Sequence, residues 1–152
     1  MTEEQILSKL TTFCARGEHC MADVHRKLDL WKIEDETLRK KVCRYLLDEK
    51  FIDEERYARA FIHDKMQYNK WGRRKVEQEL YMKRIPRDVY EPLFDEVGDN
   101  NYEEILRPLL RDKARSIKAS SDYERRMKLI RFALQRGFSY EQAEHCLSEK
   151  NK

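Results

Sequence analysis

The sequence predicts an all-α protein, arranged as an elongated right-handed or curved array of three tandem three-helix repeats. Two features of the composition favour helices: the 152 residues include only four glycines and three prolines, and 40% of the residues are charged. This composition is typical of long solvated helices and not of a turn-rich β fold. The third observation is a pattern of apolar positions that recurs after 52 and again after 53 residues.

Five apolar positions define each copy of this pattern. The first two lie four residues apart, the third follows a short break, and the last two again lie four residues apart. Positions with this spacing fall on one face of a helix, so each copy predicts a helix, a turn and a second helix. The three sets are Val24, Leu28, Ile33, Leu38 and Val42; Val76, Leu80, Ile85, Tyr90 and Phe94; and Leu129, Ala133, Phe138, Ala143 and Leu147.

Short segments after each break suit the first turn of a helix. Residues 34–36, 86–88 and 139–141 each end with an acidic side chain, which the positive N-terminus of a helix favours. One further helix is predicted before each pair, which gives nine helices in all. These preceding helices are expected at Glu3 to Cys14, at Asp53 to about Tyr68 and at Asn101 to about Lys118.

The boundaries between the predicted repeats fall near Ile52 and within residues 97–101, where glycine and asparagine suit a helix C-cap and a turn. Two prolines conflict with the pattern, because Pro92 and Pro108 lie inside predicted helices. We expect them to kink or restart those helices. The predicted repeats are residues 1–52, 53–100 and 101–152.

The chain opens without the apolar core of a signal peptide and has no apolar run of membrane-spanning length. We therefore expect a cytoplasmic protein with no membrane partner, and separately we expect a monomer. The four cysteines include no C-x-x-C pair, so we expect free thiols. The neighbours His19 and Cys20, and His145 and Cys146, diverge by about 100° on a helix and rarely share an ion, so we expect neither a metal nor a cofactor.

Three basic residues, Arg-Arg-Lys at 73–75, crowd the predicted start of a helix, although that end of a helix favours acidic side chains. The equivalent residues 21–23 of copy one are Met, Ala and Asp, so the fold itself does not require cations there. A helical projection places Arg74, Gln78 and Tyr81 on the side away from the core.

Two explanations of these cations stay open. They can pair within the helix, Arg73 with Glu77 and Lys75 with Glu79, although a basic residue before an acidic one is the weaker order. Alternatively, an anionic ligand binds both the side chains and the free amides of the helix start. We favour ligand binding and expect Arg74, which has no such intrahelical partner, to contribute most.

Copy three carries the surplus of positive charge and also an additional apolar face. Met127, Ile130 and Leu134 point away from the face that contains Leu129. These side chains can pack on the preceding helix, or they can form an apolar anchor for a partner within a polar rim. We expect Leu134 to be buried and Met127 to be at least partly exposed.

Two segments carry the most specific motifs of the chain. Residues 51–85 read FIDEERYARAFIHDKMQYNKWGRRKVEQELYMKRI and include IDEERYA and GRR, and residues 129–147 read LIRFALQRGFSYEQAEHCL and include RGFS. These segments resemble the central and C-terminal signatures of the RecX family, the regulators of the RecA recombinase. Their order and spacing fit a full-length member, whereas copy one is similar only in its hydrophobic pattern.

The resemblance implies an all-α fold of three three-helix repeats, in agreement with the apolar pattern. It also implies a non-catalytic protein, not an enzyme, that lodges in the groove of the RecA nucleoprotein filament and restrains ATP hydrolysis, strand exchange and filament extension. We expect a negative regulator of RecA in recombination and DNA repair, with weak binding to single- and double-stranded DNA. The candidate residues for binding the RecA filament or DNA are Lys70, Arg73, Arg74, Lys75, Tyr81, Lys83, Arg84, Arg125, Arg126, Lys128 and Arg131.

The main alternative is a helical protein that binds DNA directly and acts without RecA, because helix-turn-helix units place basic helices in the major groove. The net charge of +3 is modest for such a protein, and acidic residues are interleaved with the basic ones. A third interpretation is a helical scaffold for protein partners alone. The sequence contains no Gly-rich phosphate loop, nucleophile elbow or metal-spaced histidine cluster, so catalysis has little support.

Overall fold

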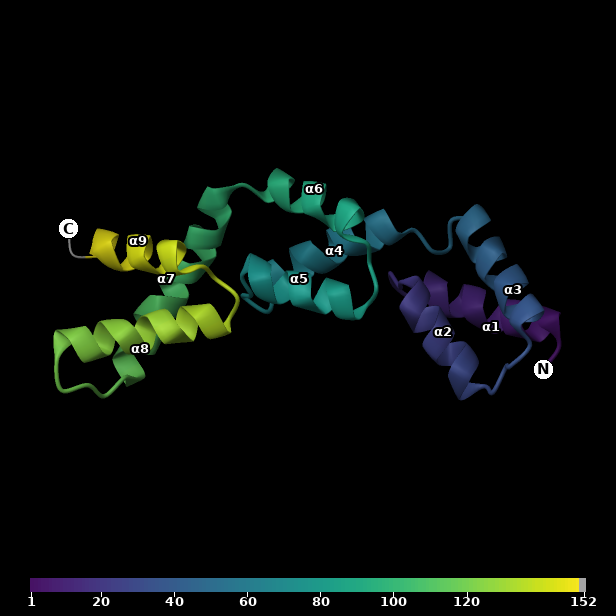
Figure 1. The fold of residues 1–152 in the computed structure, drawn as a ribbon, viewed down its shortest axis with the longest axis horizontal. Coiled ribbons are helices and arrows are strands. Elements are labelled where there is room, and N and C mark those ends of the chain that lie inside the picture. Colours follow the sequence, from purple (N-terminus) through teal and green to yellow (C-terminus); the bar gives the residue numbers. More distant parts are fainter. Residues whose placement is uncertain (151–152) are drawn as a thin grey trace.

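The computed structural model describes residues 1–150, which form nine α-helices and no β-strand. The helices follow one another along an elongated arch with the two termini at opposite ends (Figure 1), which confirms the predicted fold class. We call α1–α3 repeat 1, α4–α6 repeat 2 and α7–α9 repeat 3. The helices are α1 (Glu3–Ala15), α2 (Met21–Leu30), α3 (Glu36–Asp48), α4 (Glu54–Gln67), α5 (Arg73–Met82), α6 (Arg87–Val97), α7 (Asp99–Ser116), α8 (Asp122–Gln135) and α9 (Tyr140–Lys150).

The three helices of each repeat pack mainly on one another. Along the arch, the second helices α2, α5 and α8 lie at the lower, concave edge, and the third helices α3, α6 and α9 lie at the upper edge (Figure 1). We propose that the repeats end near residues 52 and 100, as the sequence pattern predicts. Among the described residues, no helix is both long and apolar enough to cross a membrane.

Side-chain caps explain where several helices begin. Asp35 accepts hydrogen bonds from the amides of Thr37 and Leu38 at the start of α3, at 3.0 and 3.2 Å. At the start of α4, the amide of Arg56 donates to Asp53 at 2.9 Å. Thr2, Ser121 and Ser139 cap α1, α8 and α9 in the same way. Each cap satisfies an amide that the helix itself leaves without a partner.

The second helix of every repeat ends in the same turn. Lys32, Arg84 and Gly137 occupy equivalent positions, and all three have positive φ angles, 58°, 60° and 98°. In each turn the amide of the residue after this position donates a hydrogen bond to a carbonyl of the helix, as in a Schellman motif. This bond places the apolar side chain of that residue under the turn. These bonds are Ile33 N to Leu28 O at 3.0 Å, Ile85 N to Leu80 O at 3.1 Å, and Phe138 N to Ala133 O at 3.0 Å. The repeat found in the sequence therefore extends to the backbone.

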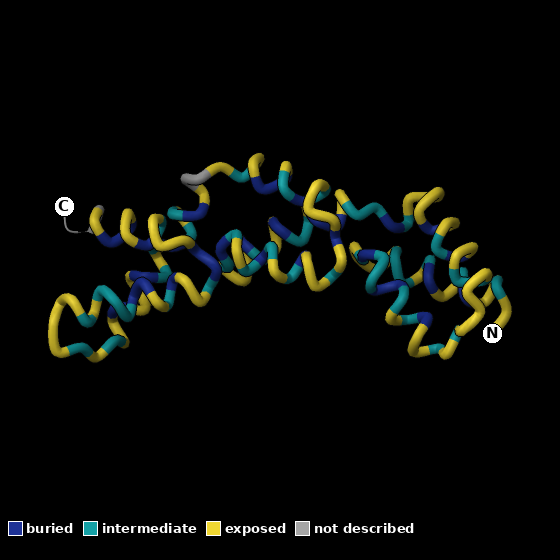
Figure 2. Tube along the Cα trace, viewed as in Figure 1, coloured by how far each residue is buried: buried dark blue, intermediate teal, exposed yellow. Residues whose placement is uncertain are grey.

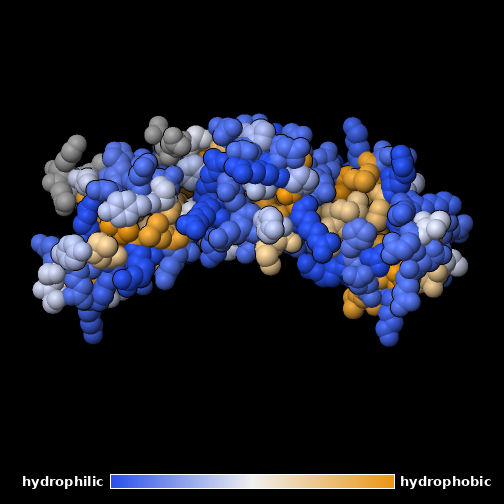
Figure 3. Space-filling view, viewed as in Figure 1, coloured by the Kyte–Doolittle hydropathy of each residue, from blue (hydrophilic) through white to orange (hydrophobic). Residues whose placement is uncertain are grey.

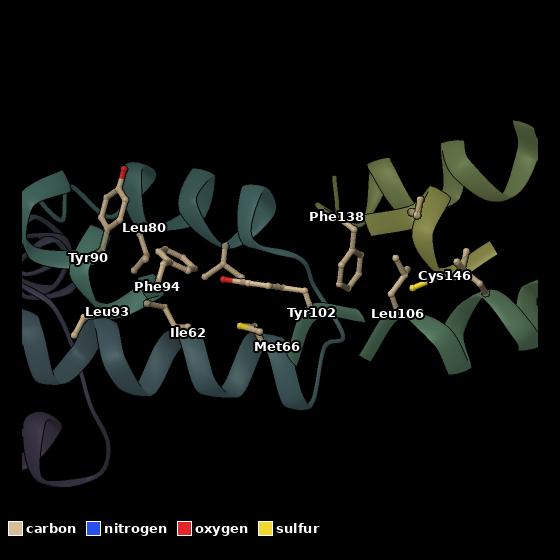
Figure 4. Close-up of a cluster of buried hydrophobic side chains, with 14 of the residues drawn as sticks. Ile62, Met66, Leu80, Tyr90, Leu93, Phe94, Tyr102, Leu106, Phe138 and Cys146 are labelled. Carbon is tan, nitrogen blue, oxygen red and sulfur yellow. The ribbon is translucent and has the colours of Figure 1, made fainter. Parts of the chain in front are cut away.

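Buried apolar side chains form two separate cores. One lies inside repeat 1 and comprises Ile6, Leu10, Val24, Leu28, Val42, Leu46 and Ile52. The other extends without a break through repeats 2 and 3. Buried positions lie on the inward faces of the helices and exposed positions on the outer edges (Figure 2). Tyr102 of α7 extends towards Met66 and Phe94 of repeat 2, and Phe138 lies beside Leu106 (Figure 4), so repeats 2 and 3 share one interior.

The two internal prolines do not restart their helices, so of the two predicted effects only a kink stays a prediction. Helix α6 continues through Pro92 and helix α7 continues through Pro108. A proline removes one helical hydrogen bond, and buried neighbours such as Leu93 and Leu106 hold these helices in the core despite that loss. Helix α7 also begins at Asp99, two residues before the predicted start, because Gly98 with φ 80° both ends α6 and precedes α7.

The additional apolar face of α8 is divided between the core and solvent. Ile130 is 2% exposed, and Met127 is partly buried against the shared core of repeats 2 and 3. Leu134 is 42% exposed, so the prediction that it is buried was wrong. Its position is equivalent to that of Tyr81 in repeat 2, which is 76% exposed. The repeat thus directs this position outward, whichever side chain occupies it.

Candidate partner-binding surface

The three cations at the start of α5 have different surroundings. Arg73 forms the predicted pair with Glu77, with 2.6 Å between Nε and Oε1, and its guanidinium lies 4.9 Å from the ring centroid of Phe94. The predicted pair of Lys75 with Glu79 does not form. Instead, the ammonium group of Lys75 lies over the ring of Trp71, 4.5 Å from its centroid, and that tryptophan lies two residues before the helix. Two of the three cations therefore have partners inside the protein.

The start of α5 also contacts the turn between α8 and α9. The amide of Gly72 donates to the carbonyl of Arg136 at 2.8 Å, and the amide of Arg74 donates to the carbonyl of Gly137 at 3.1 Å. These carbonyls belong to the C-cap of α8 and to the residue after it, and their negative partial charges offset the positive charge at the start of α5. The prediction that free amides await an anionic ligand here was therefore wrong for Gly72 and Arg74, because repeat 3 supplies their acceptors.

Two glycines make this contact possible. A Cβ atom at Gly72 would lie 2.4 Å from the carbonyl carbon of Gly137, and a Cβ at Gly137 would lie 2.5 Å from the Cβ of Lys75. Both distances are far below van der Waals contact, so any larger residue would separate the two backbones. The GRR and RGFS motifs, distant in the sequence, therefore meet at the joint between repeats 2 and 3.

The outer face of α5 and its flanking turns carry cations without partners. Lys70, Arg74 and Arg84 are exposed, and their side chains form no hydrogen bond or ion pair with the side chains that the structure describes. Tyr81 and Met82 lie on the same helix and are 76% and 74% exposed. We call these five residues the α5 surface. It combines unpaired positive charge with a large exposed aromatic and an apolar side chain, a composition typical of protein interfaces.

Lys83, another candidate, does not belong to this surface. Its ammonium group lies 2.7 Å from Oδ1 of Asp23 in repeat 1, and both side chains are largely buried. Lys83 therefore connects two repeats. The sequence could not show this, because Asp23 lies far along the chain.

Most of the candidate cations of repeat 3 have partners within the repeat. Arg125 donates to the carbonyl of Ala114 at 2.9 Å, and Arg126 lies 3.5 Å from Glu144. Lys128 contacts both the carboxylate of Glu124, at 3.1 Å, and the carbonyl of Lys118, at 2.7 Å. Only Arg131 among the four candidates here is exposed without a side-chain partner among the described residues.

A shallow basic hollow opens between the end of α7 and the middle of α8. Four cations line it, together with Ile117, Phe132 and polar groups, and no carboxylate does. The ammonium group of Lys113 lies 5.3 Å from the ring centroid of Phe132, which forms the apolar part of the hollow. Lys113 and Lys118 were absent from the sequence-based candidates, although they lie in the same basic stretch of copy three. The four cations are Lys113, Lys118, Lys128 and Arg131.

The surface of the arch, seen from the same side as in Figure 1, is mostly hydrophilic, and apolar groups gather over repeats 1 and 3 (Figure 3).

Helix α3 carries a further group of exposed cations that the sequence analysis missed, because acidic residues in copy one balance their charge. Lys41 pairs with Glu3 at 3.4 Å, whereas Lys40 is exposed and has no partner among the described side chains. The third helices lie at the upper edge of the arch (Figure 1), so these cations are separate from the α5 surface.

The cysteines pack in or against the apolar cores, and His19 packs against Phe13. No disulfide bond joins the four cysteines within the described part of the chain, and burial is the main cause that raises the pKa of Cys14, Cys20 and Cys43 above the ordinary range of a thiol. The ring of His19 stacks on that of Phe13, with 3.7 Å between centroids. Within the described part of the chain, no group of three His, Cys, Asp or Glu side chains is placed to hold a metal ion.

Family models and known proteins agree on the relationship of this chain. Residues 53–91 match the model of the second three-helix domain of RecX, and residues 101–147 match that of the third, together more than half of the chain. The Regulatory protein RecX of Vibrio parahaemolyticus is 28% identical over 134 residues, which cover 88% of this chain and 84% of that protein. That of Finegoldia magna is 33% identical over 94 residues, covering 60% and 46% of the two chains.

Solved structures show the same fold. The crystal structure of RecX from Lactobacillus salivarius superposes with a TM-score of 0.86 at 19% identity, and the match covers 97% of this chain and 95% of that one. A second crystal structure of a regulatory protein RecX gives a TM-score of 0.87 at 16% identity, covering 96% and 73%. With both domain models matched in order and the same arrangement of helices, this chain belongs to the RecX family of regulatory proteins.

Proposed function

We propose that this chain is a non-catalytic negative regulator of RecA in recombination and DNA repair. It binds the RecA–DNA filament and restrains ATP hydrolysis, strand exchange and filament extension. Membership of the RecX family supports this role, and the curated relatives bear the name of regulatory proteins. We further propose that it acts in the cytoplasm as a monomer and without a cofactor.

The α5 surface is the observation that carries this proposal. Its three unpaired cations, Lys70, Arg74 and Arg84, are free to meet carboxylates or phosphates of a partner, and Tyr81 and Met82 supply apolar contact area beside them. Arginine and tyrosine are enriched among the residues that dominate protein interfaces. Helix α5 lies at the concave edge of the arch (Figure 1), so a filament seated within that curve would meet this surface.

The joint with repeat 3 holds this surface in a fixed position. The amide of Arg74 is bonded to Gly137, and Arg73 and Lys75 pack against aromatic rings on either side. A surface that is already ordered loses little conformational entropy on binding. We therefore assign Arg73 and Lys75 to the support of the binding surface and Arg74 to contact with the partner.

The test is RecA-dependent, DNA-stimulated ATP hydrolysis with substoichiometric amounts of this protein. We expect inhibition, and we expect that replacing Lys70, Arg74 and Arg84 together by alanine weakens it by at least about tenfold, as the loss of interface hot spots does. Lys40→Ala, which removes another exposed and unpaired cation at the opposite edge, is the control. Full inhibition by the triple variant would remove the α5 surface from the site, and an absence of inhibition by the parent protein would refute the function.

Direct DNA binding remains the second candidate, because the basic hollow of repeat 3 has cations and no acidic lining residue. Binding that depends on phosphate neutralisation weakens with salt, with a logarithmic slope of about 0.9 per contact on duplex DNA. For the RecA filament we expect a shallow slope that corresponds to only a few ion pairs. A slope that corresponds to about eight contacts, equal for filament and naked DNA, would favour the second candidate.

A further inference from the structure

Two joints connect the three repeats, and they occupy equivalent places. At each joint, the start of the second helix in one repeat meets the turn after the second helix in the next. In the joint between repeats 2 and 3, Gly72 contacts Arg136 and Gly137. In the joint between repeats 1 and 2, the segment around Cys20 and Asp23 contacts Lys83. The two joints can therefore be compared position by position.

The joint between repeats 2 and 3 is closed by backbone contact. Two hydrogen bonds between main-chain groups cross it, at 2.8 and 3.1 Å, and the two glycines leave no room for a side chain. Beneath it, Tyr102 and Phe138 join the cores of the two repeats. A core without a boundary does not allow one part to rotate against the other without losing packing. Repeats 2 and 3 therefore form one rigid body.

The joint between repeats 1 and 2 lacks both features. Cys20 and Arg84 stand where the other joint has Gly72 and Gly137, and their side chains prevent the same close approach of the backbones. Within residues 1–150, no hydrogen bond between main-chain groups crosses this joint. Repeat 1 keeps its own core, and among the described residues it contributes only the buried Cys20 and the partly buried Ala22 to the core of its neighbours.

Charged side chains hold this joint instead. The ammonium group of Lys83 lies 2.7 Å from Oδ1 of Asp23, and the Lys83 side chain is 25% exposed. At the rim, Nε of Arg56 lies 2.6 Å from the carboxylate of Glu18. Asp23 has further neighbours on its own helix and loop, since His19 lies at 3.3 Å and the amide of Cys20 donates to it at 3.2 Å.

We propose that repeat 1 moves as a rigid unit against the body formed by repeats 2 and 3, and that Lys83 is the positioning residue that holds it at one angle. The ion pair with Asp23 closes the joint, and its loss lets the angle vary without unfolding either body. The same charge on Asp23 also satisfies an amide at the start of α2, so a change at Asp23 would disturb the helix itself. The ammonium group of Lys83, in contrast, pairs only across the joint within the described part of the chain, so Lys83 is the residue to replace.

The experiment compares amide hydrogen exchange of the parent protein, Lys83→Met and Lys83→Arg, residue by residue. In Lys83→Met we expect exchange at Cys20 and Tyr57, which are buried where repeat 1 meets repeat 2, to become about tenfold faster, since a hydrogen bond to a charged group is lost. The amides of Gly72 and Arg74 in the other joint should not change. Lys83→Arg, which keeps the charge, should restore slow exchange.

Small-angle X-ray scattering supplies a second measurement on the whole chain. Lys83→Met should broaden the distribution of interatomic distances, whereas Arg87→Met, which removes an ion pair with Glu91 inside α6, should not. Parent protein in about 1 M salt, where the Debye length is short, should shift in the same direction without any substitution. Unchanged exchange and scattering in Lys83→Met, or equal acceleration at both joints, would overturn the proposal.

Discussion

Replacing Gly72 by alanine tests the joint between repeats 2 and 3 with a single methyl group. The backbone of Gly72 has φ −85° and ψ 172°, angles that alanine adopts without strain, so any cost comes from contact alone. The added Cβ would lie 2.4 Å from the carbonyl carbon of Gly137 and 2.5 Å from both the carbonyl oxygen of Gly137 and the amide nitrogen of Phe138. All three are main-chain atoms, which cannot rotate aside as a flexible side chain does.

The expected magnitude follows from what the methyl group displaces. Moving the two backbones apart breaks the bonds from Gly72 to Arg136 and from Arg74 to Gly137, at about 0.5–1.5 kcal/mol each. Imperfect packing beside Phe138 adds about 1–3 kcal/mol. Alanine also restricts the unfolded chain, which offsets about 0.4–1 kcal/mol. We therefore expect the body formed by repeats 2 and 3 to lose about 2–4 kcal/mol of unfolding free energy.

Thermal unfolding followed by circular dichroism measures this loss. A destabilisation of this size lowers the Tm of a chain of this length by about 10 °C. Gly17→Ala is the matched control, because a Cβ there meets nothing within 4 Å, and its Tm should equal or slightly exceed that of the parent. A Gly72→Ala protein with an unchanged Tm and a still protected Arg74 amide would refute the role assigned to the two glycines.

Three further outcomes are expected. Arg74→Ala should leave the Tm within about 2 °C, as exposed substitutions usually do, and should weaken binding to RecA filaments in a pull-down or anisotropy titration. Ile130→Ser should cost several kcal/mol in urea unfolding because the site is buried, whereas Leu134→Ser should cost less than about 1 kcal/mol. Hydrogen bonds from Ser120, aided by Lys128, lower the pKa of Glu124 to about 2. The stabilisation that the charged carboxylate contributes is therefore complete at pH values above the ordinary pKa of a glutamate, and it is lost as the pH falls towards 2. A side-chain NMR titration should show this midpoint, and Ser120→Ala should raise it; an ordinary midpoint in the parent would contradict the local geometry.

The helices were predictable because their signals are local. Apolar positions at helical spacing, capping residues such as Asp53 and a glycine at the end of α6 act within a few residues of the chain. These signals fixed the class, the order of the helices and most of their ends. The continuation of α6 through Pro92 and the error at Leu134 have a different origin, since tertiary packing decides whether a proline is tolerated and whether an apolar side chain is covered.

The joints were not predictable, because they bring together residues from different repeats. Arg73 and Lys75 were identified as cations in an unfavourable place, but nothing near them in the sequence indicates that the turn at Gly137 supplies the compensating carbonyl groups. Lys83 was assigned to a binding surface for the same reason, since its partner Asp23 belongs to another repeat. The motifs themselves were a signal, because a small residue in each of two distant motifs can mark a close approach of two backbones.

The three repeats share a scaffold but not a surface, and this difference bears on how the protein meets a partner. Equivalent positions 22, 74 and 127 carry Ala, Arg and Met, although the helices that contain them share the same pattern of apolar residues and end in the same turn. A partner composed of identical subunits would therefore meet a different side chain at each repeat, with Arg74 contributing charge and Met127 apolar area. Because repeat 1 changes its angle relative to repeats 2 and 3 in this proposal, we expect a partner to bind first to the rigid body formed by repeats 2 and 3, whose surface is already ordered. Contacts of repeat 1 then follow as a second step. A variant that frees the first joint should accordingly dissociate faster, while its association rate stays close to that of the parent.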